Sequence, residues 1–195
     1  MSPALCLLWE RSRNPIHRER SVHAPPQTLL KEQLGGVHDI LEQTIADCSQ
    51  HTLDMNPSNA TITNIGSIYA HIIFSEDGIV QGMLQKKAPV FHATGWGSRL
   101  NVHMPKDPQF DPAWGRAVRL NLPSFREYAK AVYAATDHYV SSLGPADLER
   151  KVDTGFIGEQ TVGFVLGNIC VWHVAEHNGE IAALKGVQGL KGLPF

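Results

Sequence analysis

Residues 160–189 read QTVGFVLGNICVWHVAEHNGEIAALKGVQG. The apolar residues and two histidines of this stretch recur every three or four positions, which places them on one stripe of an α-helix. The stripe consists of Leu166, Ile169, Cys170, His173, His177, Ile181 and Leu184. Gly186 and Gly189 follow it, and glycine commonly stands just after the last helical residue. The stretch therefore predicts a helix over about 160–185 with one buried face.

Three further segments carry the same periodicity, over about 27–48, 64–84 and 124–143. Asn64 and Ser124 are predicted to cap the last two, because short polar side chains accept hydrogen bonds from the free N–H groups of a first turn. No strand pattern of comparable strength competes with these helices. Helices of about 20 residues are ~30 Å long, which is typical of a bundle. We therefore predict an all-α fold, an antiparallel four-helix bundle with a long loop between its second and third helices.

That long loop spans residues 85–123. Structureless loops beyond about 15 residues are usually functional or disordered. The loop is rich in aromatic side chains, which argues against disorder. These residues are Phe91, His92, Trp96, His103, Phe110 and Trp114. We expect the loop to cover or line a site, with Trp96 or Trp114 near a substrate.

The first 25 residues differ from the rest. Met1–Trp9 is apolar, but the charged residues come after it, whereas a secretory signal carries its charge first. Glu10 and Glu19 also argue against a transit peptide, since such peptides are poor in acidic residues. We interpret residues 1–25 as a disordered leader and residues 26–195 as the bundle domain.

The composition fits one globular domain and excludes several classes of function. The 195 residues are 43% hydrophobic and 18% charged, with a net charge of -2. This balance gives no support for a nucleic-acid partner, and no apolar run is long enough to span a membrane. The three cysteines, Cys6, Cys48 and Cys170, form no C-x-x-C pair. Reduced thiols and a cytoplasmic location are the simplest interpretation.

His173 and His177 carry the chemistry. Residues four apart lie on one face of a helix with their Cβ atoms ~5–6 Å apart, so two imidazoles so placed can bind one metal ion. Such a pair also arises by chance on a solvated face. Here, however, the stripe is apolar both before and after the histidines, which indicates a face turned to the core. Buried imidazoles need partners, and a metal ion is a strong candidate.

His71 is the best third ligand, because a stable site with an open position needs three protein ligands. It lies on a strip of small polar residues beside the isoleucine face of its helix. The strip consists of Asn64, Ser67, His71, Ser75 and Gly78. A solvent-facing strip usually carries Lys, Arg or Glu, and this one carries none. Glu76 and Asp77 point away from the strip and are not expected at the site.

Glu180 is the candidate catalytic group. It lies close in angle to His173 and one turn beyond His177, where it could be a partner of a ligand, a fourth ligand or a base. A surface glutamate is the competing interpretation. Residues 173–177 also match the H-x-x-E-H protease signature. We reject that reading, because such enzymes take their third ligand far downstream and the chain ends at Phe195.

Two stretches resemble the DinB/YfiT-like superfamily of four-helix metalloproteins. They are NIGSIYAHIIFSED at 64–77 and VGFVLGNICVWHVAEHNGEIAALKGVQGLKGLPF at 162–195. In that superfamily one histidine on the second helix and an H-x-x-x-H pair on the last bind a divalent metal. Matched position by position, these are His71, His173 and His177. The resemblance covers residues 27–195 and excludes the leader.

The resemblance implies a metal-dependent enzyme that transfers a low-molecular-weight thiol to a small electrophile, or a thiol-dependent isomerase. A metal-dependent hydrolase and a non-catalytic bundle that binds metal or a small ligand remain alternatives. Imidazole suits zinc, nickel, iron and copper, and we expect zinc or nickel first and iron next. The expected partners are a small-molecule substrate and a small thiol. A homodimer is the default assembly, since two-fold dimers are the commonest oligomers.

Overall fold

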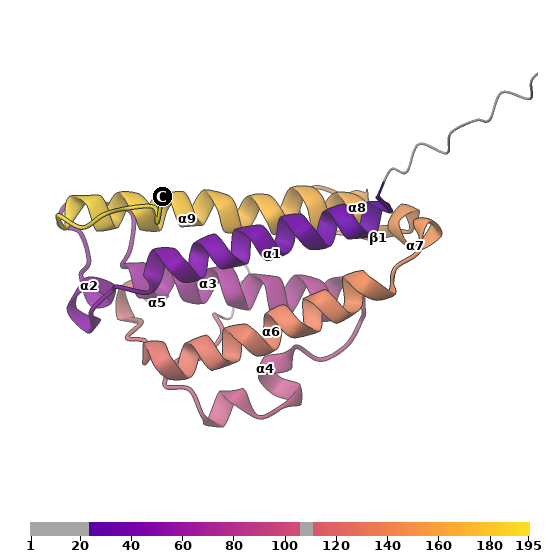
Figure 1. The fold of residues 1–195 in the computed structure, drawn as a ribbon. Helices are drawn as coiled ribbons and strands as arrows, with labels where there is room; N and C mark the ends of the chain where they lie inside the picture. The colour runs from indigo at the N-terminus through magenta and orange to yellow at the C-terminus, as the bar shows by residue number, and fades with distance from the viewer. Residues whose placement is uncertain (1–23, 106–110) are drawn as a thin grey trace, which may run out of the picture.

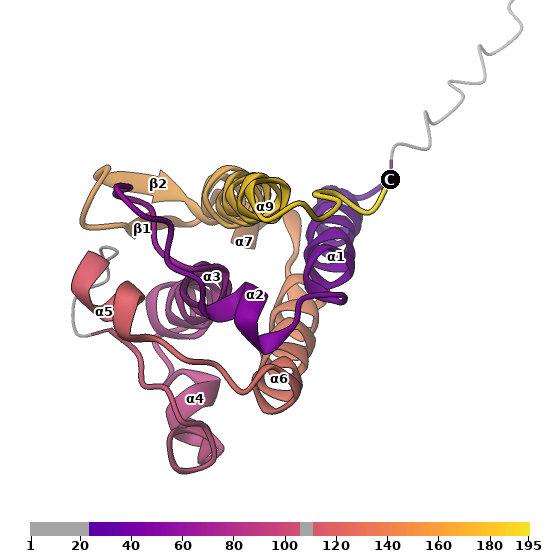
Figure 2. The same ribbon diagram turned by 90° about the vertical axis from the view of Figure 1, so that its left-hand side faces the viewer.

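The computed structural model describes residues 24–105 and 111–195, and within them it is an all-α fold with one small hairpin. Four long helical segments pack side by side (Figures 1 and 2). They are α1 (Pro26–Ile45); α3 (Ile65–Asp77), continued by the π-helical turns η1 (Gly78–Leu84); α6 (Leu122–Ser142); and α9 (Val171–Val187), preceded by α8 (Val162–Phe164) and the π-helical turns η3 (Val165–Cys170). The predicted all-α class and the four helical segments are confirmed. Of the predicted leader, residues 1–23 lie outside the described residues.

Two buried clusters show how the four segments run. One end of the bundle joins the start of α1 to the ends of η1 and α6 and to η3, through Leu34, Leu84, Val140 and Leu166. The other end joins the end of α1 to the starts of α3 and α6 and to the end of α9, through Ile45, Ile65, Phe125 and Leu184. The predicted antiparallel packing therefore holds for α1 with α6 and for α3 with α9. In contrast, α1 and α9 run parallel, and so do α3 and α6, because the connection between α3 and α6 returns along the bundle.

The inner helix of the bundle is α3, in which twelve of thirteen residues are buried. Its isoleucines supply much of the apolar surface, and burial of that surface stabilises the packing. Asn64 caps the helix as predicted, since its Oδ1 accepts a 2.8 Å hydrogen bond from Ser67 N–H. The same side chain donates through Nδ2 to the Gly115 carbonyl at 3.1 Å. Asn64 thus ties the start of α3 to the distant segment around Gly115.

The connections carry short elements of their own. They are α2 (Gln50–Asp54), α4 (Val90–Ala93), η2 (Trp96–Ser98), α5 (Pro112–Ala117), α7 (Pro145–Glu149), β1 (Lys151–Asp153) and β2 (Glu159–Thr161). The long connection from η1 to α6 is anchored by the buried Asp77. Its carboxylate accepts hydrogen bonds from Val90 N–H at 2.8 Å, Phe91 N–H at 2.9 Å and Tyr128 O–H at 2.7 Å. The described part of this connection is therefore held against the bundle.

Two details differ from the sequence prediction. The cap of α6 is Asn121, whose Oδ1 accepts from Ser124 N–H at 3.0 Å, so Ser124 lies inside the first turn. The last helix was expected from about Gln160, but residues 159–161 form β2, which pairs with β1 in an antiparallel hairpin. Left-handed backbone at Gly155 and Gly158, with φ of 78° and 75°, closes that hairpin, a conformation that glycine adopts readily.

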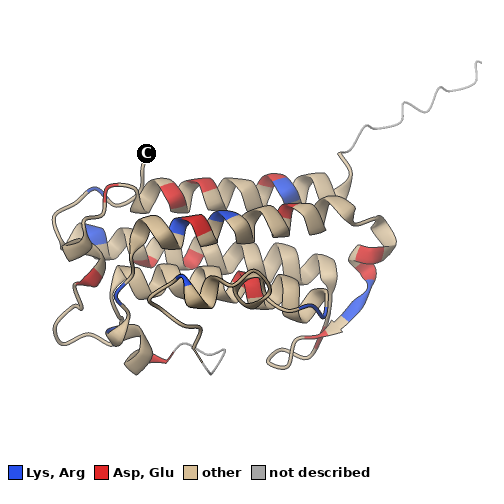
Figure 3. Ribbon diagram, turned by 90° about the horizontal axis from the view of Figure 1, so that it is seen from below, with Lys and Arg blue, Asp and Glu red and all other residues tan. Residues whose placement is uncertain are grey.

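Acidic and basic residues are interspersed along the same helices (Figure 3). This mixture agrees with the small net charge of -2. Among the described residues, no helix combines the length and the apolar character needed to cross a bilayer.

Candidate metal centre

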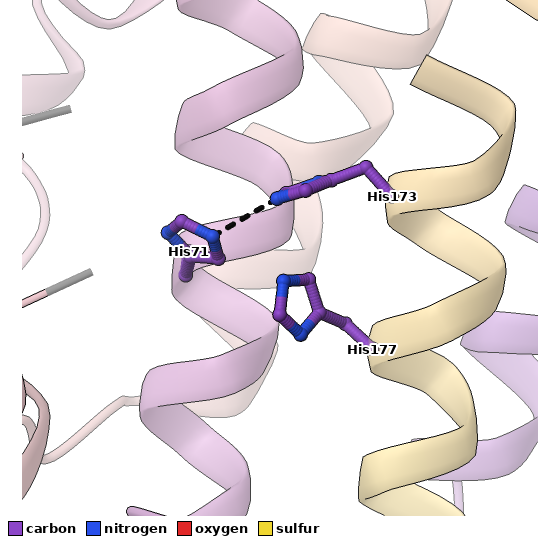
Figure 4. A group of neighbouring side chains, drawn as sticks. All are labelled: His71, His173 and His177. Carbon is purple, nitrogen blue, oxygen red and sulfur yellow. Dashed lines mark hydrogen bonds between the residues drawn. The ribbon is translucent and has the colours of Figure 1, made fainter. Parts of the chain in front are cut away.

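The three predicted histidines meet between α3 and α9 (Figure 4). His71 extends from α3, and His173 and His177 extend toward it from successive turns of α9. Their candidate ligand nitrogens all lie within 4.8 Å of one another. The ring centroids are separated by 4.8 Å for His71 and His173, 5.0 Å for His71 and His177, and 4.5 Å for His173 and His177. Residues separated by a hundred positions in the sequence thus form one cluster.

Burial keeps two of the imidazoles neutral. Desolvation lowers the pKa of His71 to about 4, and the neighbouring His177 shifts it in the same direction. Desolvation also lowers the pKa of His173 to about 3, with further contributions from His71 and His177. Neutral imidazole is the form that binds metal ions, because the lone pair must be available. At neutral pH these rings are therefore in the metal-binding form without any loss of a proton to solvent.

A hydrogen bond of 2.9 Å joins Nε2 of His71 to Nε2 of His173. One ring must donate and the other accept, so the two Nε2 atoms point at each other across the gap between the helices. Metal binding would replace this contact, since both atoms would then need a lone pair directed at the ion. The geometry therefore already aims the two nitrogens at a shared point.

Glu180 is the hydrogen-bond partner of His177. Its Oε2 accepts from His177 Nδ1–H at 2.6 Å, and its side chain is 45% exposed. A proton held on Nδ1 leaves Nε2 of the same ring with its lone pair. Carboxylates commonly orient metal-binding histidines in this way. Of the roles considered for Glu180, the partner of a ligand is the one that this contact supports.

The cluster fits a divalent cation by the chemistry of its donors. Two nitrogens bound to one zinc ion at ~2.0–2.1 Å lie at most ~4.2 Å apart, so the observed spread of 4.8 Å requires only small side-chain rotations. Three neutral imidazoles would leave the ion its full charge and an open position. His71, His173 and His177 could therefore hold a metal ion, and imidazole alone does not select which one.

A cavity of about 320 Å³ lies beside the cluster. Its lining combines His177 and Glu180 of α9 with Ile68 of α3 and the segment 61–63 that precedes α3. Sequence reasoning did not identify that segment, because residues 61–63 carry no charge, no metal-ligand type and no periodicity. The cavity therefore reaches the histidine cluster at His177.

The long connection does not supply the lining of this cavity, contrary to expectation, among the residues that the structure describes. Trp96 is buried, with the Arg99 guanidinium 3.7 Å and the Tyr128 ring centre 5.8 Å from its ring centre. Trp114 packs near Phe74 and lines a separate hollow of about 140 Å³. Phe110 lies outside the described residues.

The remaining polar residues of α3 divide between the site and the core. Ser67 is fully buried and shares a 2.8 Å hydrogen bond with the Thr63 hydroxyl, which excludes a solvent face for this strip. Glu76, which was not expected at the site, is buried elsewhere in the bundle, where it accepts from the Thr136 hydroxyl and pairs with His38 at 2.7 Å. Cys170 is a buried thiol, and burial raises its pKa.

Comparison with known proteins agrees with the fold. A family model described as the DinB superfamily matches residues 31–181. A crystal structure described as a conserved protein from Enterococcus faecalis superposes with a TM-score of 0.72 at 17% sequence identity. The match covers 86% of this chain and 99% of that chain, and it shows a shared fold. No curated protein matches the chain.

Proposed function

The chain belongs to the DinB superfamily, and we propose that it is a metal-dependent enzyme that transfers a small thiol to an electrophilic carbon. One observation carries the proposal. The nitrogens of His71, His173 and His177 lie within 4.8 Å of one another, and one of the three rings, that of His177, lines a cavity together with Glu180. A ligand cluster that borders a cavity suits a reactive ion better than a structural one, because structural sites are closed by a fourth protein ligand.

A bound divalent cation would supply the charge that deprotonates a coordinated thiol, which is otherwise only a few per cent thiolate at neutral pH. His71, His173 and His177 would supply the nitrogens that hold it. Glu180 keeps the His177 ring in the tautomer that directs Nε2 toward the cluster. Ile62 and Ile68 provide apolar wall for the carbon body of a second substrate.

The transfer step balances as a substitution. The thiolate sulfur forms a new C–S bond with its own electron pair, and the leaving group departs with the pair of the bond that breaks. The thiol proton passes to water or to Glu180, the carboxylate in the cavity lining. With a double bond in place of a leaving group, the same attack gives a transient adduct, which an isomerase would release again.

The test is a pair of assays on metal-loaded protein. The first uses chlorodinitrobenzene or a bromobimane as electrophile, with and without small thiols. The second uses ester substrates without any thiol. Thiol-dependent turnover that is lost in His173→Ala supports the proposal. Ester turnover without thiol would instead indicate a hydrolase, and no turnover in either assay would favour a non-catalytic metal-binding bundle.

A further inference from the structure

The cavity beside His177 changes from polar to apolar with depth. Two of its lining residues are exposed, Thr61 and Glu180, and the Glu180 side chain is 45% exposed. Ile68 is the opposite case, with 2% of its surface exposed, and Ile62 is intermediate in burial. Exposed lining marks the mouth of a cavity and buried lining marks its interior. A molecule that enters past Thr61 and Glu180 therefore meets the two isoleucines further in.

The two isoleucines lie next to the residues expected to hold the ion. Ile68 precedes His71 by three residues on α3, so the two side chains are neighbours on the helix surface. His177 shares the cavity lining with both isoleucines. In the proposed transfer, the reacting carbon has to lie at the His177 side of the cavity, where a coordinated thiol would be. The rest of the second substrate then extends along Ile62 and Ile68.

The wall that carries Ile62 is fixed at both ends by α5. The Ala60 carbonyl accepts a 2.8 Å hydrogen bond from the Arg116 guanidinium. The Asn64 side-chain amide donates to the Gly115 carbonyl at 3.1 Å. Arg116 and Gly115 both belong to α5, so the segment between Ala60 and Asn64 is anchored on either side. A wall held in this way discriminates between ligands by size, because a ligand that is too long has to displace packed groups.

The volume of the cavity limits the second substrate to a small molecule. About 320 Å³ is at the small end of ligand sites, which span roughly 300–1,000 Å³. Transfer of apolar carbon from water to an isoleucine wall strengthens binding by roughly fourfold for each methylene. That gain ends at the length at which the chain fills the cavity. An alkyl chain therefore has a limiting length here, beyond which added methylenes no longer raise its affinity.

We propose that Ile62 and Ile68 form the specificity pocket of this cavity, and that the second substrate is a small electrophile with an alkyl body whose length Ile62 limits. Ile62 is the residue at which the limit can be changed, since it is half-buried and lies outside α3. The inference rests on the proposed function, because it names the class of electrophile that this site takes. Binding of the alkyl body needs no ion and no thiol, so it can be measured separately from the reaction.

The first test measures binding without any reaction. Unreactive n-alkanols from 1-propanol to 1-octanol are titrated into chelator-treated, full-length protein, and the methyl signals of ¹³C-labelled isoleucine are followed by NMR. We expect the Ile62 and Ile68 signals to shift on binding. The Kd should fall by roughly fourfold for each methylene and then become constant at the limiting length.

Variants at Ile62 test which residue sets the limit. Ile62→Ala removes most of the side chain and should raise the limiting length by about two methylenes, since the surroundings fill only part of the space left behind. Ile62→Phe adds volume and should lower the limiting length. Ile79→Ala is the matched control, because Ile79 is also partly buried but packs against the buried cluster at the other end of the bundle. It should leave the limiting length unchanged.

The second test asks whether the same limit governs the reaction. Metal-loaded protein receives one small thiol and a series of n-alkyl bromides, whose intrinsic reactivity changes little with length because the added carbons are distant from the reacting carbon. We expect kcat/KM to rise with chain length and to become constant at the limiting length found with the alkanols. Ile62→Ala should move both limits together.

The outcomes separate this inference from the proposed function. Alkanol Kd values that do not depend on chain length would overturn the inference, and so would a limiting length shared by wild type, Ile62→Ala and Ile62→Phe. Equal shifts in Ile62→Ala and Ile79→Ala, or thiol transfer whose length dependence is unchanged in Ile62→Ala, would also overturn it. The expected alkanol binding without any thiol-dependent turnover would support the alkyl pocket and overturn the proposed function.

Discussion

Among single residues, Glu180 controls how His177 presents its ring. The contact from Nδ1 to Oε2 is 2.6 Å, and removal of the acceptor frees the ring to rotate or to change tautomer. We expect Glu180→Ala to weaken metal affinity by about 10–100-fold, the usual effect of losing such a partner. Glu180→Gln retains an acceptor, so its metal affinity should lie between those of the wild-type protein and Glu180→Ala. Competition with a coloured chelator measures the affinity.

Glu176→Ala is the matched control for that experiment, since Glu176 is exposed one turn earlier on the same helix. It should leave the affinity unchanged. Equal losses in Glu180→Ala and Glu176→Ala would show that general negative charge matters and that the hydrogen bond to His177 does not.

The depressed pKa values of His71 and His173 predict an acid-sensitive metal-free fold. Above pH 6.5 the two rings are neutral in both the folded and the unfolded chain, so His71 and His173 do not make the free energy of unfolding depend on pH there. Between pH 6.5 and about 4 the unfolded chain takes up protons at these positions that the folded chain excludes. The free energy of unfolding should therefore fall on acidification, by up to about 1 kcal/mol per pH unit for each buried histidine.

Urea unfolding of chelator-treated protein at pH 7, 6 and 5 measures this slope. His173→Ala should flatten the slope, while His138→Ala, at an exposed position, should not. A slope that is the same in all three proteins would mean that burial of the cluster does not govern its protonation.

The histidine cluster could be predicted from the sequence because each of its residues belongs to a recognisable local pattern. The spacing of four residues places His173 and His177 on one face of a helix, and a strip without charged residues identifies His71 as the third ligand. Glu76 and Asp77 show the limit of such reasoning. Their angle correctly placed them off the strip, but periodicity along one helix cannot reveal that they are buried against partners from other elements.

At the scale of elements, Asp77 joins the long connection to the bundle. Its buried carboxylate accepts from two backbone N–H groups at the start of α4 and from Tyr128. Asp77→Ala would leave these donors unsatisfied, and we expect a loss of roughly 2–4 kcal/mol in the free energy of unfolding. Asp137→Ala, at a half-exposed position on α6, should change it by less than about 0.5 kcal/mol. Equal effects would show that α4 is not anchored through this carboxylate.

The long helices could be predicted from the sequence, whereas the short elements could not. The stripes of α1, α3, α6 and α9 each span several turns, which periodicity detects. The strands β1 and β2 have three residues each, too few for an alternating pattern to stand out. The π-helical turns η1 and η3 were also missed, since apolar spacing along a sequence does not distinguish them from α-helix.

For the whole molecule, the predicted boundary between a leader and the bundle domain can be tested by deletion. The Pro25 carbonyl accepts a 2.8 Å hydrogen bond from Thr28 N–H and so belongs to the first turn of α1. Deletion of residues 1–23 retains that contact and removes no described core residue. We expect the melting temperature to change by no more than about 2 °C. A larger drop would show that the leader packs on the bundle.

The order of helices in space could not be read from the sequence. Four amphipathic segments predict a bundle, but their stripes say only that each has a buried face. The parallel course of α3 and α6 depends on how the chain between Leu84 and Leu122 returns along the bundle, and its anchors at Asp77 and Asn64 bond to backbone groups distant in the sequence. Contacts of that kind leave no local pattern.

We expect His71, His173 and His177 together to hold one divalent ion, and metal analysis of purified protein measures this. Wild-type protein should carry about one ion per chain, and the triple alanine variant at these positions should carry almost none. A matched triple alanine variant of the exposed His51, His92 and His138 should retain the wild-type content. Equal metal content in the two triple variants, with circular dichroism showing both to be folded, would contradict the assignment.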